Sequence, residues 1–236
     1  MPRLLSCLVA ACLALASAAP NTEAAGAPAT ALTLDQALAL FARTQGSIQT
    51  LQASFEERKE LSLLKEPVVQ KGTFYHSKPQ FFLWDYASPT VKKILLTDDL
   101  LLAYYPEMKR AEEVNVRRWT SQIRRYLQVG ENLEEMRKDY EVALGEAGSD
   151  DLAGATLLVL TPKNKKVRAK LEQIRICLDP VSGLTQRVIY KEGDGDKTVF
   201  TFKDIEVNRE IDASRYQIAL PPDVKMGDSF TAFASR

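Results

Sequence analysis

The fold is decided by residues 71–114, which read KGTFYHSKPQFFLWDYASPTVKKILLTDDLLLAYYPEMKRAEEV. Runs of aromatic and β-branched residues alternate in this stretch with turn residues such as Pro79, Pro89 and Asp99. This alternation predicts five consecutive short strands joined by tight turns, hence an antiparallel sheet. Successive rather than alternate positions are apolar in residues 81–84, so we expect both faces of the sheet to be covered.

The remainder of the chain extends this sheet. A first long strand is predicted over residues 48–64, and the strand pattern returns over residues 140–207. We predict a mainly β (α+β) fold, a single curled antiparallel sheet that forms an open half-barrel of about eleven strands with a helical lid. Pro221 and Pro222 are expected to prevent further strand pairing near the C-terminus.

The lid is predicted from two stretches with helical periodicity, residues 34–45 and residues 118–138. The first follows Thr33 and Gln36, which have the spacing of a capping box. Each stretch has a narrow apolar stripe on an otherwise polar surface. The stripe residues are Leu34, Leu38 and Phe41 in the first stretch and Trp119, Ile123 and Leu127 in the second.

An apolar cleft is expected between this lid and the sheet. For any one of its residues ordinary core is the favoured explanation, but two small helices are an unusual seal for a core unless they also open. A cleft with few polar groups suits hydrocarbon chains, because each buried methylene gains about 0.8 kcal/mol. The predicted sheet residues of the cleft are Phe74, Phe82, Trp84, Ile94, Leu96, Leu101, Ala103 and Tyr105.

The N-terminus predicts export. Arg3, the apolar run 4–15 and the small residues 16–18 have the form of a secretory signal peptide cleaved near Ala18. We therefore expect a signal peptide over residues 1–18, a flexible leader over 19–31 and one domain over 32–236, located in the periplasm. Cys12 also fits a lipoprotein cleavage box, so a lipid anchor at Cys12 is the alternative.

Composition argues against two classes of function. Thirty-one basic residues balance 31 acidic ones, so no net field favours nucleic acid. His76 and Cys177 are the only histidine and cysteine of the expected mature chain, and no nucleophile motif, phosphate loop or cluster of metal ligands accompanies them. We predict a non-enzyme without a cofactor or metal site.

Several short motifs occur in a characteristic order. They are Gly72-x-Phe74, the run Lys78 to Trp84 (KPQFFLW), the strand 198–202 (TVFTF) and the run 221–224 (PPDV). In this order and spacing the chain resembles LolA, the family of periplasmic outer-membrane lipoprotein carriers. The resemblance implies a half-open barrel, monomeric, that takes lipoprotein acyl chains from an inner-membrane ABC-type release complex to an outer-membrane acceptor lipoprotein.

Lys78 stands where the family usually has an arginine that holds the lid closed, so the resemblance implies that Lys78 is a lid latch. An ammonium lacks the planar fork of a guanidinium, and a looser lid follows. Two other functions remain open: a chaperone for a glycolipid or another apolar small molecule, and an envelope-stress sensor with the same fold. The sequence does not identify the cargo.

Overall fold

The computed structural model describes residues 32–79, 81–117 and 133–227. These residues belong to one compact unit. The predicted signal peptide and leader lie outside the described residues, as do Trp119, Ile123 and Leu127 of the predicted lid. The domain boundaries therefore stay a prediction.

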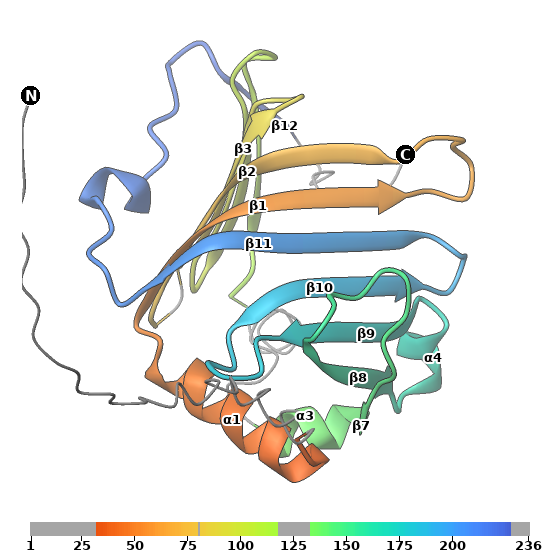
Figure 1. Cartoon of the computed structure of the whole chain (residues 1–236). Helices are drawn as coiled ribbons and strands as arrows, with labels where there is room; N and C mark the ends of the chain where they lie inside the picture. Colours follow the sequence, from red (N-terminus) through yellow and green to blue (C-terminus); the bar gives the residue numbers. More distant parts are fainter. Residues whose placement is uncertain (1–31, 80, 118–132, 228–236) are drawn as a thin grey trace, which may run out of the picture. The chain divides into compact units, whose positions relative to one another are not determined.

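A single twelve-stranded sheet dominates the described part of the chain, with the order β12-β6-β5-β4-β3-β2-β1-β11-β10-β9-β8-β7 (Figure 1). The mainly β, open and curled fold predicted from the sequence is confirmed. The elements are α1 (Leu34–Ser47), β1 (Thr50–Glu60), β2 (Val68–Ser77), β3 (Phe81–Ser88), β4 (Lys92–Leu96), β5 (Leu100–Tyr105), β6 (Arg110–Asn115), α3 (Leu133–Asp139), β7 (Tyr140–Leu144), β8 (Thr156–Pro162), α4 (Lys165–Arg168), β9 (Leu171–Leu178), β10 (Thr185–Glu192), β11 (Lys197–Val207), the 3-10 helix η1 (Ala213–Tyr216) and β12 (Lys225–Gly227).

One edge of the sheet differs from the prediction. β12 pairs with β6 in parallel, with Lys225 opposite Arg110, whereas we expected an entirely antiparallel sheet and no strand after Pro222. The two prolines lie in the turn that precedes β12, so they remove no hydrogen bond from it. The Lys225 amide donates to the Lys109 carbonyl at 2.8 Å. β12 therefore covers the edge of β6, which would otherwise be unpaired.

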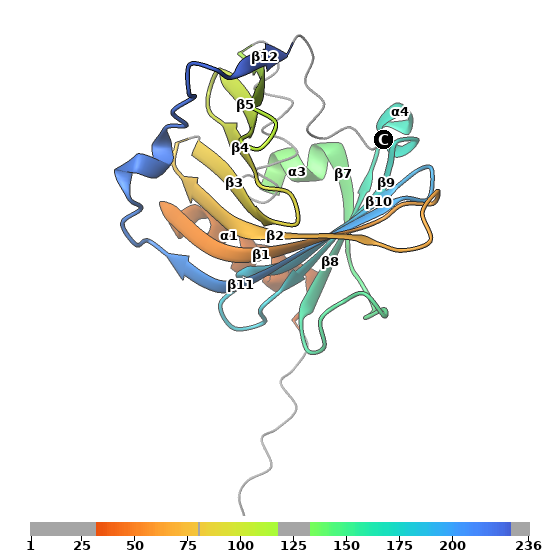
Figure 2. The same cartoon turned by 90° about the horizontal axis from the view of Figure 1, so that it is seen from above.

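The register of β2 to β5 aligns the predicted cleft residues across the sheet. Phe74 lies opposite Trp84, Trp84 opposite Ile94, and Ile94 opposite Ala103. Because side chains alternate between faces along a strand, these residues share one face, which we call the inner face. The sheet curves around this face, and α3 lies on the inner side of the curve (Figure 2).

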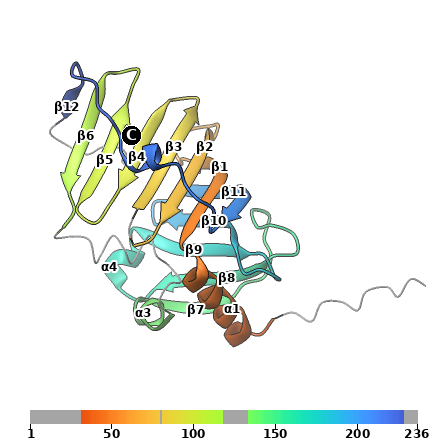
Figure 3. The same ribbon diagram turned by 90° about the vertical axis from the view of Figure 1, so that its left-hand side faces the viewer.

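The opposite, outer face of the same strands is also apolar. Leu83, Leu95 and Leu102 belong to a buried cluster there. The C-terminal segment 211–224 crosses these strands on the outside (Figure 3), and its Tyr216 ring lies 4.6 Å from the ring of Phe81. This segment explains why the strands are apolar at successive positions.

α1 covers one end of the inner face. Its first turn has the predicted capping box between Thr33 and Gln36, and the helix runs two residues past the predicted end. Ala37, Leu38 and Phe41 are buried against β8, β9 and Met136 of α3. Of the second predicted lid stretch, the described part is helical over Leu133–Asp139. None of the helices in the described ranges is long and apolar enough to span a membrane.

Candidate functional site

A cavity of about 650 Å³ lies on the inner face of the sheet. Strands β1 to β3 and strands β9 to β11 form two walls, and Phe41 and Gln45 of α1 contribute to the lining. The volume falls within the range of roughly 300–1,000 Å³ that is usual for ligand pockets. The cavity is therefore large enough for a small organic ligand.

The first wall is aromatic and comes mainly from β1 to β3. The ring of Phe74 lies 5.2 Å from that of Trp84, 6.4 Å from that of Phe82 and 5.9 Å from that of Phe202, measured between centroids. Inward-facing residues of β1, including Leu51 and Ala53, continue this wall toward α1. Contacts between rings fix the shape of the wall, because each ring packs against more than one neighbour.

The second wall comes from β9, β10 and β11. Pairing of β1 with β11 places Phe202 opposite Phe55, and pairing of β10 with β11 places Val188 opposite Phe200. Inward-facing residues on alternate positions of the three strands then line the cavity. They are Ile174, Ile176, Val188, Tyr190, Phe200 and Phe202.

The eight sheet residues that the sequence predicts for the cleft all lie on the inner face, in two neighbouring clusters. Ile94 and Ala103 are fully buried, and Tyr105 packs beside them rather than on the cavity. The five that line the cavity are Phe74, Phe82, Trp84, Leu96 and Leu101.

The second wall was not predicted from the sequence as part of the cleft. Its strands were predicted, and the alternation in residues 197–207 and 171–178 indicates which side chains share a face. The sequence pattern does not show which strand pairs with β1 on the side away from β2. Because β11 pairs with β1 across about 156 residues of sequence, as the pair Leu51 and Val207 illustrates, no local pattern places Phe202 beside Phe74.

The end of the cavity remote from α1 is polar. Glu57 is 3% exposed, and its Oε1 atom lies 3.4 Å from Nζ of Lys59. Burial, followed by the charge of Glu57, raises the pKa of the Tyr86 phenol. Burial lowers the pKa of Lys92, an effect that Glu57 opposes, and the Lys92 ammonium lies 4.1 Å from the centroid of the Tyr86 ring. An otherwise apolar cavity thus ends in a small group of charged and phenolic side chains.

His76 lies in the first wall. Its ring stacks on Phe82 with a centroid distance of 4.4 Å, and Nδ1 lies 3.0 Å from the carbonyl oxygen of Phe81. Burial lowers the pKa of His76, the hydrogen bond to Phe81 opposes this effect, and the nearby charge of Lys78 lowers it further. The histidine is therefore a neutral part of the wall at pH 7.

Lys78 connects the β2–β3 turn to α1. Its Nζ atom donates to the carbonyl oxygens of Gln45 and Gly46, at 3.2 Å each. These carbonyls belong to the last turn of the helix, where backbone acceptors have no partner within the helix and a cation is favourable. Lys78 is thus positioned to hold α1 against the sheet.

No cluster of three or more His, Cys, Asp or Glu side chains suitable for a metal ion occurs among the described residues. Cys177 is fully buried in β9, and burial raises the pKa of its thiol. A raised pKa leaves little thiolate at neutral pH, which is the opposite of what a nucleophilic cysteine needs.

A model of one protein family, outer membrane lipoprotein carrier protein LolA, matches residues 46–219, well over half of the chain. The chain belongs to the LolA family. This confirms the resemblance seen in the sequence.

Two relatives carry the name outer-membrane lipoprotein carrier protein. The protein of Chromohalobacter salexigens is 24% identical over 153 residues, 64% of this chain and 67% of its own. That of Cupriavidus pinatubonensis is 24% identical over 217 residues, 91% of this chain and 94% of its own. An uncharacterized conserved protein from Thermus thermophilus has a similar fold, with a TM-score of 0.51, 10% identity, and coverage of 82% of this chain and 97% of its own.

Proposed function

We propose that this LolA-family chain is a periplasmic carrier that shields the acyl chains of lipoproteins, or of a related lipid, on their way from the inner to the outer membrane. The observation that carries the proposal is the cavity of about 650 Å³ lined by Phe74, Trp84, Ile176 and Val188. Such a lining offers apolar surface to a chain that water would otherwise surround.

The energetics of such a cavity favour capture. Burying roughly ten methylenes of an acyl chain gains about 8 kcal/mol, before the costs of association are subtracted. Directed contacts are not needed for this gain, because apolar burial is not directional. A carrier of this kind therefore accepts acyl chains attached to different proteins.

Release requires that the cover of the cavity move. α1 contributes Phe41 and Gln45 to the lining, and Lys78 holds the last turn of this helix. We propose that an inner-membrane ABC-type complex loads the cavity and that an outer-membrane acceptor lipoprotein empties it. On this proposal the protein needs no cofactor and catalyses no reaction.

Trp84 allows a direct test, since it lines the cavity and the chain has only two tryptophans. Acyl chains brominated along the tail should quench the fluorescence of the purified, delipidated protein in a saturable way. In the variant Trp84→Phe the quenching that arises at Trp84 should disappear, so that any residual quenching comes from Trp119, while binding measured by equilibrium dialysis persists. Failure of any acyl chain to bind the delipidated protein would refute the proposal.

Cargo identity separates the carrier from the alternatives. Protein purified from its native periplasm should yield triacylated lipoprotein by mass spectrometry, and it should release lipoproteins from inner-membrane vesicles that contain the ABC-type complex. Extraction of a glycolipid alone would instead favour the small-molecule chaperone. Stable capture of a regulatory membrane protein without bound lipid would favour the sensor.

A further inference from the structure

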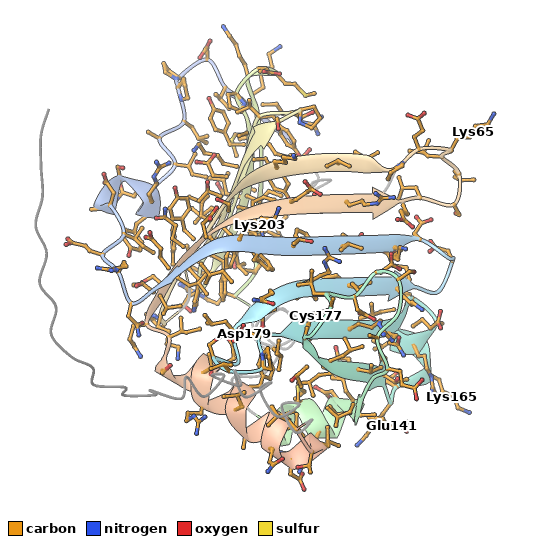
Figure 4. All side chains as sticks on the ribbon, in the orientation of Figure 1. Lys65, Glu141, Lys165, Cys177, Asp179 and Lys203 are labelled. Carbon is orange, nitrogen blue, oxygen red and sulfur yellow. The ribbon has the colours of Figure 1, made fainter. Side chains whose placement is uncertain are left out.

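The inner face of β1 changes character along the strand. Its inward-facing residues run Leu51, Ala53, Phe55, Glu57 and Lys59, apolar near α1 and charged at the far end. The β1–β2 loop with Lys65 and the helix α4 with Lys165 lie at this same far end (Figure 4). A ligand in the cavity therefore meets an apolar end and a polar end.

Glu57 is the unusual residue of the polar end. It is 3% exposed, and its Oε2 atom has no hydrogen-bond partner among the described residues. Lys59 lies 3.4 Å from the other carboxylate oxygen, Oε1, and the Tyr86 phenol also acts on this carboxylate through a side-chain hydrogen bond. Oε2 is left over, on a side chain that lines the cavity. Leaving a buried carboxylate oxygen unpaired is costly, so such an atom indicates a position where a ligand supplies the missing donor.

The neighbouring charges indicate what kind of donor fits. Lys59 and Lys170 line the same end as Glu57 and Glu192, and Lys92 interacts electrostatically with Glu57. Three ammonium groups against two carboxylates already compensate the acidic charge, so a further cation would gain little. A neutral hydroxyl or amide N–H satisfies the open acceptor without adding charge.

We propose that Glu57 determines specificity: its Oε2 atom accepts a hydrogen bond from a neutral hydroxyl or amide N–H at the polar end of an acyl ligand, whose tail extends toward α1. This inference rests on the proposed acyl-carrier function and names the ligand class more closely. Amide-linked and hydroxylated acyl groups carry such a donor next to the chain, and simple acyl esters do not.

The test compares neutral probes with equal chains: N-methyltetradecanamide and tetradecanol, which have a donor, and methyl tetradecanoate, which has none. Their dissociation constants are measured in the wild type, in Glu57→Leu, in Glu57→Gln and in the control Glu56→Leu. Glu56 is a neighbour on the opposite face of β1, where it pairs with Lys71 at 3.3 Å. For each protein we take the ratio of donor-probe affinity to ester affinity. Comparing this ratio between variants cancels the different solubilities of the probes, which are the same for every protein.

We expect this ratio to fall about tenfold or more in Glu57→Leu, because a hydrogen bond to a charged acceptor is lost. Ester affinity should change by less than about threefold, since the apolar walls remain. Glu57→Gln keeps the side-chain volume and should lose part of the ratio, which provides a second variant should Glu57→Leu fold poorly. The control should match the wild type.

A ratio that is unchanged in both Glu57 variants would overturn this inference while leaving the carrier function intact. If Glu57→Gln binds neither the ester nor the amide, the inference is also overturned. Glu57 would then maintain the structure of the cavity rather than accept a hydrogen bond from the ligand. If none of the three probes binds the wild type, the proposed function itself fails. If the Glu57 variants lower the relative affinity for the amide but not for tetradecanol, or the reverse, the result identifies whether the site prefers an amide N–H or a hydroxyl donor.

Discussion

The Nζ atom of Lys78 lies 3.2 Å from the carbonyl oxygen of Gln45, and this hydrogen bond joins the turn after β2 to the last turn of α1. The same ammonium reaches the Gly46 carbonyl. The contact satisfies acceptors that the helix itself leaves open. One flexible side chain thus links the first wall of the cavity to the helix at its apolar end.

Replacing Lys78 by leucine should speed ligand release more than it lowers stability. One charge-assisted contact at a partly exposed site contributes about 1 kcal/mol, so we expect a release rate about three- to tenfold higher. Stopped-flow displacement of a fluorescent acyl ligand measures the rate, and urea unfolding measures stability. Lys203→Leu, on the exposed outer side of β11 (Figure 4), is the control and should leave the rate unchanged. Equal release rates in all three proteins would contradict a latch at Lys78.

Filling the cavity should abolish binding without unfolding the protein. Val188 lines the second wall, so Val188→Trp places a large ring where the ligand would lie. We expect at least a tenfold loss of acyl-chain affinity in equilibrium dialysis, with a change in unfolding free energy below about 1 kcal/mol because the ring enters open space rather than packed core. Lys203→Trp adds the same ring outside the cavity and should bind normally.

Stability should fall as pH decreases from 7 toward 5, because of His76. Its pKa is lowered in the folded state, so below the unfolded-state pKa of about 6.5 the unfolded chain binds more protons and is favoured. His76→Gln should show a flatter profile of urea midpoints over this range. Any contribution of Glu192, whose pKa burial raises, is common to both proteins and cancels in the comparison. Parallel profiles would mean that His76 is not buried as described.

Gly72 should tolerate no side chain. A Cβ atom there would lie 2.2 Å from the backbone oxygen of Asp85 and 2.9 Å from Cα of Tyr86, so β2 and β3 would have to separate. We expect Gly72→Ala to cost about 2–3 kcal/mol of unfolding free energy. Gly46→Ala is the matched control, because a Cβ atom at Gly46 meets nothing within 4 Å. That variant should be neutral or slightly stabilising in urea unfolding.

The first wall of the cavity could be predicted from the sequence because it is built from strands that are neighbours along the chain. Turn residues divide 71–114 into adjacent hairpins, and adjacent hairpins pair in order, so Phe74, Phe82 and Trp84 fall on one face by alternation alone. Lys78 was predicted as the lid latch from the family resemblance, and not from the pattern of residues around it. Contact of Lys78 with α1 depends on the tertiary arrangement.

The rest depends on long-range pairing. Phe200 and Val188 line the same cavity as Phe74 only because β11 pairs with β1, and this pairing depends on the arrangement of the whole sheet. Glu57 was not predicted as a cavity residue, although the parity of β1 places it with Phe55 on the inner side. The parallel pairing of β12 arises from an edge that no sequence pattern marks.

The two ends of the strand order, β12 and β7, do not pair with each other. A closed barrel admits a guest only through its mouth, so a fatty tail tethered to a folded polypeptide would have to be threaded in end-first. An unclosed sheet removes this restriction, because a tail can be laid in sideways while its tether stays outside, with no ladder of backbone hydrogen bonds to be broken and remade at each loading.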